Sequence, residues 1–301
     1  MNTKFIGHKK MYIIFLIAVF FFTGNEILIA SANNKKENIE TEFRQMEKDN
    51  NARIGVYALD TENGSVVRYR YDERFAYCSL AKVFIVGEIL RQNSLKNLKK
   101  NVSYNNEDIL SYAPITSKHI ETGMTIENLC SAAIRFSDNT AGNLLLCQIG
   151  GINGFKKSLL NINDTTTQVM RNEPTLNTAI PGDTSDTSTP YQMAMNFKAY
   201  TLDNILPREK RTLLLDWMSG NNITDTLIRA GVPIDWKVAD KSGSGGYGTR
   251  NDIAFITRPS HAPIILVVMT THKNVDAKSN DALVAMVTKI VINKINRGPS
   301  R

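Results

Sequence analysis

Histidine and cysteine are scarce in this sequence, with four His and three Cys among 301 residues. No two histidines have the spacing of zinc ligands, and the cysteine spacing does not resemble a metal site, which disfavours a metal-dependent hydrolase. We therefore expect no bound metal and no other cofactor. The three cysteines are an odd number, so an exported chain would keep at least one free thiol.

A concentrated basic surface is also missing. The formal net charge of +7 is mild, and the basic residues are scattered along the chain. Proteins that bind nucleic acids usually gather lysine and arginine in a patch or stripe. We therefore expect no nucleic-acid partner, and the charge is better explained by a general role in solubility.

The N-terminal apolar run, Met11–Phe22, is too short to span a bilayer comfortably. A lysine-rich segment precedes this run, and the small residues Ala30-Ser31-Ala32 follow it. This order is typical of a secretory signal peptide. We expect residues 1–32 to be removed by cleavage near Ala32, leaving an exported protein, periplasmic or secreted, without a stable membrane anchor. A retained N-terminal anchor is the weaker alternative.

The rest of the chain is long enough for one large or two modest domains. Strand-like composition appears near both of its ends, in Arg53–Asp60, Ser65–Tyr71, Trp236–Ser242, Arg250–Thr257 and Pro263–Thr271. Helical patterns appear in Leu80–Leu90, Ile126–Ile134, Thr140–Ile149, Pro207–Met218 and, from about Ser279, up to Asn293. The pattern predicts an α+β fold with a discontinuous sheet domain, 33–75 and 222–301, and an inserted helical domain, 76–221.

One long stretch, Asn161–Pro190, has neither a helical nor a strand pattern and is rich in Thr, Asp, Pro and Gly. Loops of this length inside a compact domain are usually functional or disordered. This segment is therefore a candidate part of a functional site.

The first candidate for chemistry is Ser79-Leu80-Ala81-Lys82. Residues i and i+3 share a helix face, so the amine of Lys82 can lie beside the hydroxyl of Ser79. The run Leu80–Leu90 is apolar nearly all round, as in a buried helix. Burial lowers the pKa of a lysine, which can then accept a proton from a serine nucleophile. Taken alone, however, the motif more often marks a helix start capped by the serine.

Two further motifs are equally ambiguous on their own. Ser137-Asp138-Asn139 offers a hydroxyl for proton relay and an amide for a polar ligand group, but it could be an ordinary helix N-cap. Lys241-Ser242-Gly243 ends a β-rich run, where a cation and a hydroxyl could hold a carboxylate. A ligand could also lie along this strand edge. The alternative is a Gly-rich hairpin turn.

The order of the three motifs is more informative than any one of them. Ser-x-x-Lys, then Ser-Asp-Asn, then Lys-Ser-Gly is the signature of penicillin-binding enzymes. From about Ile54 to its C-terminus, the chain resembles the class A β-lactamases. The segment Arg171–Asn177 is similar to the omega loop of that family. The resemblance implies a β-lactamase/DD-peptidase-like fold with an omega loop at about 168–186, a β-lactam as small-molecule substrate, and a monomer.

The resemblance also implies how a β-lactam would acylate the enzyme. Ser79 would attack the lactam carbonyl of penicillins and cephalosporins, a reaction that confers antibiotic resistance. The backbone N–H groups of Ser79 and Ser244 would form the oxyanion hole. Either Lys82, or Glu173 acting through a water molecule, would take the proton of Ser79, and the family resemblance leaves this choice open.

The resemblance also implies roles in the later steps, in substrate binding and in the support of the loop. Ser137, helped by Lys241, would pass a proton to the lactam nitrogen. Glu173 and Asn177 would hold the water that cleaves the acyl-enzyme, with Glu173 as general base. The resemblance gives substrate contacts to Tyr112, Asn139, Asn177, Ser242, Gly243, Ser244 and Arg250, and supporting roles in the loop to Asn143, Arg171 and Asp186.

The omega loop both follows and departs from the family pattern. Arg171 and Asp186 match an ion pair that closes the loop, and the Glu173–Pro174 peptide bond is expected to be cis, which costs little before proline. Met170 and Ser185 replace an Asp and an Arg that many members have. These two departures concern the rigidity of the loop rather than its chemistry.

The thiols are expected to form no disulfide. Phe84 and Gly245 occupy places where related enzymes have the cysteines that pair with Cys130 and Cys78. Cys130 and Cys147 lie on either side of the Ser-Asp-Asn turn, and a bridge needs Cα atoms within about 7 Å. We expect a buried Cys78 and two further thiols inside the helical domain, packed as small hydrophobic groups.

Two other functions share the three motifs. A cell-wall DD-peptidase would lack the pair formed by Glu173 and Asn177, so penicillin would leave it acylated. A penicillin-sensing receptor domain would keep its adduct as a signal and would need membrane helices. Turnover of the penicillin adduct distinguishes the β-lactamase from both.

Overall fold

The computed structural model describes residues 39–221 and 223–297. The expected signal segment, 1–32, therefore lies outside the described residues. A helix at 39–50 comes first. The chain from Glu47 to Pro299 forms one compact unit, and the elements named below belong to it.

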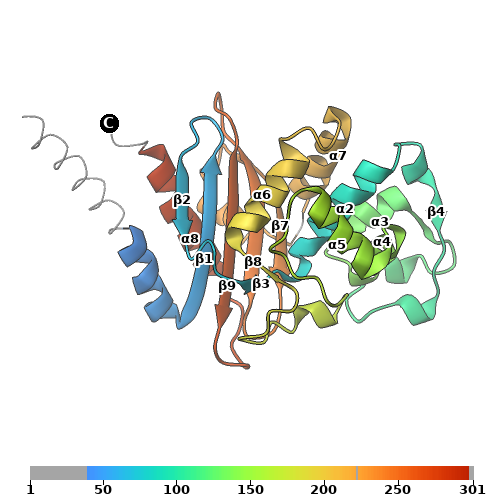
Figure 1. The fold of residues 1–301 in the computed structure, drawn as a ribbon, viewed down its shortest axis with the longest axis horizontal. Helices are drawn as coiled ribbons and strands as arrows, with labels where there is room; N and C mark the ends of the chain where they lie inside the picture. The colour runs from blue at the N-terminus through green and yellow to red at the C-terminus, as the bar shows by residue number, and fades with distance from the viewer. Residues whose placement is uncertain (1–38, 222, 298–301) are drawn as a thin grey trace, which may run out of the picture. The chain divides into compact units, whose positions relative to one another are not determined.

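The unit is built around a five-stranded antiparallel sheet with the strand order β2-β1-β9-β8-β7 (Figure 1). Its strands are β1 (Ala52–Asp60), β2 (Val66–Tyr69), β7 (Lys237–Ser244), β8 (Arg250–Thr257) and β9 (Ile264–His272). Two small sheets pair β3 (Phe75–Ala76) with β6 (Thr187–Ser188), and β4 (Asn101–Val102) with β5 (Met124–Thr125). The main sheet thus comes from both ends of the unit, as the sequence predicts.

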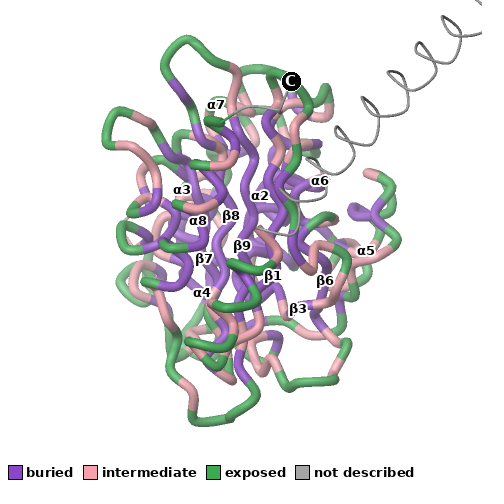
Figure 2. Tube along the Cα trace, turned by 90° about the vertical axis from the view of Figure 1, so that its left-hand side faces the viewer, coloured by how far each residue is buried: buried purple, intermediate pink, exposed green. Residues whose placement is uncertain are grey.

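Most of the helices lie in the chain between β2 and β7. They are α2 (Ala81–Gln92), α3 (Ile126–Arg135), α4 (Asn139–Gln148), α5 (Gly151–Asn161), α6 (Pro190–Thr201) and α7 (Arg208–Ser219), while α8 (Asp281–Asn296) follows the sheet. Helix α6 packs on β1 and β9, and α8 packs on β2, β8 and β9. Strand β9 is buried almost throughout, and Figure 2 shows the burial of these central strands. The predicted α+β class is confirmed.

Helix α2 lies at the centre of the helical part. All of its residues from Ala81 to Leu90 are buried, and the helix contacts α3, α4, α6 and α7. Each fully buried Val, Ile, Leu or Phe side chain contributes roughly 1.5–3 kcal/mol. The helix that carries Lys82 is therefore buried, as the sequence predicts.

Two helices were not predicted from the sequence. Helix α5 begins at Gly151, directly after Gly150, a glycine pair that resembles a turn, and α6 begins at Pro190, the expected end of the long loop. The side chain of Thr189 caps α6 by accepting a hydrogen bond from the amide of Gln192. Proline is favoured in the first turn of a helix, so Thr189-Pro190 is a helix-start signal that the sequence prediction overlooked.

The prediction for one thiol was wrong. Cys78 and Cys130 are free and buried, but Cys147 is free and exposed. The buried positions near the end of α4 are Leu145, Leu146 and Ile149, so Cys147 falls on the opposite side of the helix. Its place in the helical segment was correct, and the helical period puts its side chain in solvent.

Candidate active site

Three buried side chains meet at the start of α2. A 3₁₀ turn, Cys78–Leu80, leads into the helix and carries Ser79. Lys82 donates a hydrogen bond from Nζ to Ser79 Oγ at 3.0 Å, and Ser79 Oγ donates to Glu173 Oε1 at 3.0 Å. Lys82 Nζ also lies 2.8 Å from Glu173 Oε1. The serine hydroxyl is thus in contact with both groups that could take its proton.

The side chain of Ser79 does not cap the helix. Leu80 is the N-cap residue of α2, and no side-chain capping bond is formed there. Cys78, the residue before Ser79, has a positive φ of 52°, which is uncommon for a residue with a side chain. Such backbone strain is found most often at functional sites. The capping explanation for the Ser-x-x-Lys motif is therefore wrong.

The amine of Lys82 is held by several acceptors. It donates to Asn139 Oδ1 at 2.6 Å and to the carbonyl oxygen of Ser137 at 2.9 Å, besides its contact with Ser79. Burial lowers the pKa of Lys82, while the neighbouring Glu173 carboxylate opposes that shift. The site thus favours a lysine that can give up its proton more easily than one in water.

The Ser-Asp-Asn motif serves as both a cap and a part of the site. Asp138 caps α4 by accepting a hydrogen bond from the amide of Ala141 at 2.9 Å. It also accepts bonds from the amide and hydroxyl of Thr116, each 2.9 Å long. The backbone amide of Asn139 donates to the carbonyl oxygen of Tyr112 at 2.9 Å. The cap thereby fixes the loop that presents Tyr112.

Lys241 is completely buried near the end of β7, at the edge of the sheet. Its Nζ donates to Ser137 Oγ at 2.9 Å and to the carbonyl oxygen of Ser242 at 2.6 Å. In 39–221 and 223–297, it forms no ion pair with a carboxylate. Burial, reinforced by the charge of Lys82, lowers the pKa of Lys241 to about 7.

The omega loop is fixed at its neck and beneath Glu173. Arg171 Nε lies 2.5 Å from Asp186 Oδ2, which confirms the expected ion pair. The Glu173–Pro174 bond is cis, as predicted. Asn143, on α4, forms hydrogen bonds with the backbone of Glu173. The loop is also bound internally by an ion pair between Arg171 and Asp183, 3.1 Å apart, although Met170 and Ser185 depart from the family pattern.

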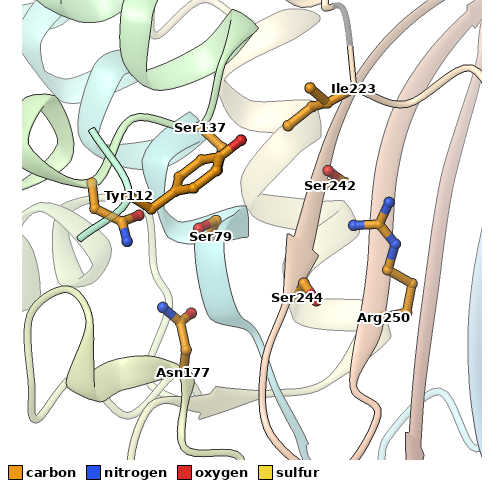
Figure 3. Close-up of a pocket in the computed structure, with 9 residues that line it drawn as sticks. Ser79, Tyr112, Ser137, Asn177, Ile223, Ser242, Ser244 and Arg250 are labelled. Atoms are coloured by element: carbon orange, nitrogen blue, oxygen red, sulfur yellow. The ribbon is translucent and has the colours of Figure 1, made fainter. Parts of the chain in front are cut away.

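A cavity of about 320 Å³ opens in front of Ser79. Figure 3 shows Tyr112 on one side of Ser79, with Ser242, Ser244 and Arg250 on the other. The lining residues are Ser79, Tyr112, Ser137, Asn139, Asn177, Ile223, Ser242, Ser244 and Arg250. Lys82, Glu173 and Lys241 are not among these lining residues and are themselves buried.

Gly243, a predicted substrate contact, is not among the residues that line the cavity, whereas Ile223 is. A Cβ atom on Gly243 would lie 2.9 Å from the carbonyl oxygen of Tyr77 and 3.3 Å from the amide nitrogen of Ser79. Glycine therefore lets strand β7 pass close to Ser79. Ile223 was not predicted as a site residue. Its apolar side chain follows polar neighbours, and no motif connected it to the cavity.

Arg250 reaches the cavity but also has a partner within the chain. Its Nε lies 2.7 Å from Asp281 Oδ1, at the start of α8. The guanidinium group that lines the cavity is therefore already partly neutralised. No group of His, Cys, Asp or Glu suited to bind a metal is found in the part of the chain that the structure describes.

The sequence of the chain matches a known protein family and several named relatives. A model of the "Beta-lactamase enzyme family" matches residues 38–295. The chain belongs to the β-lactamase family. The β-lactamase of Bacillus subtilis (strain 168) is 49% identical over 253 residues, covering 84% of this chain and 83% of the relative. That of Bacillus amyloliquefaciens is 45% identical over 305 residues, covering 98% of this chain and 100% of the relative.

Solved structures place the chain in class A of the β-lactamases. A class A β-lactamase from Clostridium kluyveri DSM 555 has a TM-score of 0.84 and 52% identity, covering 85% of this chain and 98% of that one. A class A β-lactamase from Mycobacterium abscessus has a TM-score of 0.82 and 43% identity, covering 86% and 99%. The chain is a serine β-lactamase that hydrolyses the β-lactam ring, which removes the DD-peptidase and the receptor domain as alternatives.

Proposed function

We propose that Ser79 is the nucleophile and that Glu173 is the general base for deacylation. The observation that carries this proposal is the triangle formed by Ser79, Lys82 and Glu173, with all three groups buried and within 3.0 Å of one another. A hydroxyl in contact with a base can be deprotonated as it attacks a carbonyl carbon. Lys82 and Glu173 both touch Ser79 Oγ, so the geometry supports either as the base for acylation.

Glu173 has a second partner that suits a hydrolytic role. Asn177 Nδ2 donates to Glu173 Oε2 at 2.5 Å. Asn177 Oδ1 is buried and has no hydrogen-bond partner among the described residues. A water molecule between these two side chains would donate one hydrogen to Glu173 and the other to Asn177. The water would then attack the ester of the acyl-enzyme while Glu173 takes its proton.

Acylation also requires a proton donor for the lactam nitrogen. Ser137 Oγ lies between Lys241 Nζ at 2.9 Å and Lys82 Nζ at 3.4 Å. The Ser137 hydroxyl would give its proton to the departing nitrogen and recover one from a lysine. The backbone N–H groups of Ser79 and Ser244 would hold the carbonyl oxygen as its charge develops.

The cavity offers complementary groups for penicillins and cephalosporins. The substrate carboxylate would bind to Ser242, Ser244 and Arg250, which share one side of the cavity. Gly243 has no side chain, which would let the substrate lie close to strand β7. Asn139 would bind the amide of the drug's side chain. Its Oδ1 is occupied by Lys82, whereas its Nδ2 has no partner within 39–221 and 223–297. Tyr112, with 47% of its surface exposed, would cover one face of the ligand.

The proposal for Glu173 is tested with the variant Glu173→Gln. Glutamine cannot accept a proton from the hydrolytic water, while Lys82 can still activate Ser79. Intact-mass analysis after mixing with benzylpenicillin is expected to show a long-lived adduct on Ser79. Glu121→Gln, which changes an exposed residue, should turn over as the unaltered enzyme does. Hydrolysis by Glu173→Gln at the unaltered rate would contradict the proposed role.

We also propose that the enzyme is exported, periplasmic or secreted, and acts as a monomer. The order of basic, apolar and small residues in 1–32 supports export. No helix of the described residues is long and apolar enough to cross a bilayer. N-terminal sequencing of the protein recovered outside the cytoplasm should find a start near Asn33. Light scattering should give the mass of one mature chain, and a mass of two chains would contradict the monomer.

A further inference from the structure

Two completely buried carboxyl groups lie beside Lys241 on neighbouring strands. Asp240 is on β7 and Asp252 is on β8, and both side chains have no exposed surface. Asp240 is opposite Ala254, and Ser242 is opposite Asp252. Asp240 and Asp252 are therefore diagonal neighbours on one face of the sheet. Lys241, between Asp240 and Ser242, points to the other face.

Each of these carboxyl groups has one oxygen without a hydrogen-bond partner among the described residues, Oδ2 in Asp240 and Oδ1 in Asp252. A buried polar atom that lacks a partner is costly, and a buried charge that lacks one is costlier still. The two unpaired oxygens belong to adjacent side chains. A single hydrogen placed between them would satisfy both.

The other two oxygens show which group is the anion. Asp240 Oδ1 accepts bonds from Arg229 Nη2 at 2.8 Å, from Arg229 Nε at 3.0 Å and from the Thr224 hydroxyl at 3.0 Å. Asp252 Oδ2 accepts only the amide of Ile228, at 3.2 Å. The guanidinium of Arg229 therefore balances the charge of Asp240, while no cation among the described residues forms a hydrogen bond or an ion pair with Asp252.

The charges that face this pair favour the same assignment. Burial and the nearby carboxylate of Asp240 raise the pKa of Asp252, and the cations Arg250 and Lys241 only partly oppose this shift. Arg250 is itself paired with Asp281. Burial also raises the pKa of Asp240, with Arg229 opposing the shift most strongly. Lys241 additionally faces Lys82 and Glu173 across the active site.

We propose that Asp252 is protonated at neutral pH and donates its hydrogen to Asp240, so that the pair carries a single negative charge, neutralised by Arg229. The proton is taken from water as the chain folds. Lys241 then has no uncompensated anion behind it, and its proton remains available to Ser137, whose hydroxyl it contacts. Asp240 and Asp252 are thus positioning residues for Lys241, an inference that rests on the proposed role of Lys241.

The protonation state can be measured without reference to activity. In the enzyme labelled with ¹³C at the aspartate carboxyl carbon, one signal is expected to keep the shift of a protonated acid at pH 7. That signal should be absent from Asp252→Asn and present in the control Asp276→Asn, which changes an exposed aspartate. If every aspartate of the unaltered enzyme has the shift of an ionised carboxylate at pH 7, the proposal is wrong, whatever the role of Lys241.

Kinetics test the consequence for Lys241. Asparagine has the charge of a protonated aspartic acid and can donate the same hydrogen bond, so Asp252→Asn should keep the alkaline limb of kcat/KM where it is. If Asp252 were ionised, the substitution would remove a negative charge, and the alkaline limb would move to lower pH. Such a shift would overturn the proposal. If Asp252→Asn does not fold, the ¹³C titration of the unaltered enzyme still decides the protonation state.

Discussion

Asn143 and the backbone of Glu173 are joined by two hydrogen bonds that use both ends of one amide. Asn143 Nδ2 donates to the carbonyl oxygen of Glu173 at 2.9 Å, and Asn143 Oδ1 accepts from the amide of Glu173 at 3.0 Å. Helix α4 therefore fixes the backbone of Glu173, the proposed general base, on both sides of its Cα atom. The carboxylate needs this support because its position relative to Ser79 determines where the hydrolytic water can sit.

Replacement of Asn143 by alanine should slow deacylation more than acylation. A displacement of about 1 Å in a catalytic group can reduce a rate on the order of 10²-fold. We expect kcat for benzylpenicillin to fall by up to about that factor, with an acyl adduct accumulating in the steady state. Rapid-quench measurement of the adduct separates the two steps. Equal slowing of both would contradict a specific role in placing Glu173.

The substitution Asp186→Asn should loosen the neck of the omega loop. Asp186 is fully buried and accepts bonds from the Arg171 side chain and from the amides of Met170 and Arg171. Breaking a buried pair costs roughly 3–5 kcal/mol, and partial exposure of Arg171 favours the lower end of that range. We expect a lower melting temperature together with slower deacylation. Unchanged values of both would show that the pair does not stabilise the loop.

The stability of the free enzyme should rise with pH above neutrality because of Lys241. Its pKa is lowered to about 7 in the folded state, from its usual value of 10.5. Between these values the unfolded chain binds more protons, so the free energy of unfolding increases with pH, by at most about 1.4 kcal/mol per pH unit. In Lys241→Met this part of the rise should be missing. Parallel curves for the two proteins, from urea unfolding at a series of pH values, would contradict the lowered pKa.

The activity of the enzyme should reflect the same titration. In the proposed mechanism only the protonated form of Lys241 can return a proton to Ser137, so kcat/KM should decline at a pH well below the usual pKa of lysine. Arginine keeps its charge at high pH. The variant Lys241→Arg should therefore move the alkaline limb upward, even if its maximal rate is lower. If the alkaline limb of kcat/KM lies at the same pH in both enzymes, it reflects the titration of a group other than Lys241.

The sequence predicted those parts of the site that depend on local geometry. Ser79 and Lys82 are one helical turn apart, so their contact follows once the helix is recognised. The partnership of Asn143 with Glu173 joins residues far apart in the chain, and only the resemblance to a family predicted it. Ile223 and Asp252 were missed because no local pattern marks a residue that becomes functional through its neighbours in the fold.

The fold, like the site, was predicted where local sequence patterns mark an element and missed where they do not. The strands β7, β8 and β9 were found within about two residues because their apolar runs end at glycine or proline-containing turns. Helix α5 was missed because it contains Gly151 and Gly154, and glycine is a poor helix former. A Cβ on Gly154 would lie only 1.8 Å from the carbonyl oxygen of Ile149. Close packing against the preceding turn therefore requires glycine at position 154, and the same glycine makes the helix hard to recognise from the sequence.

The three thiols should react in two distinct steps. In the folded enzyme, Cys147 is exposed, whereas Cys78 and Cys130 are buried and burial raises the pKa of both thiols. Thiolates are the reactive species, so the buried pair is protected by both inaccessibility and protonation. Titration with a thiol reagent should find one group in the native protein and three after unfolding without a reductant. In the variant Cys147→Ser, the same titration should find no reactive thiol in the native protein and two after unfolding. Cys147 does not line the cavity, so its modification should leave turnover unchanged. A single reactive group after unfolding would reveal a disulfide, and rapid reaction of two groups in the native enzyme would show that Cys78 or Cys130 becomes exposed.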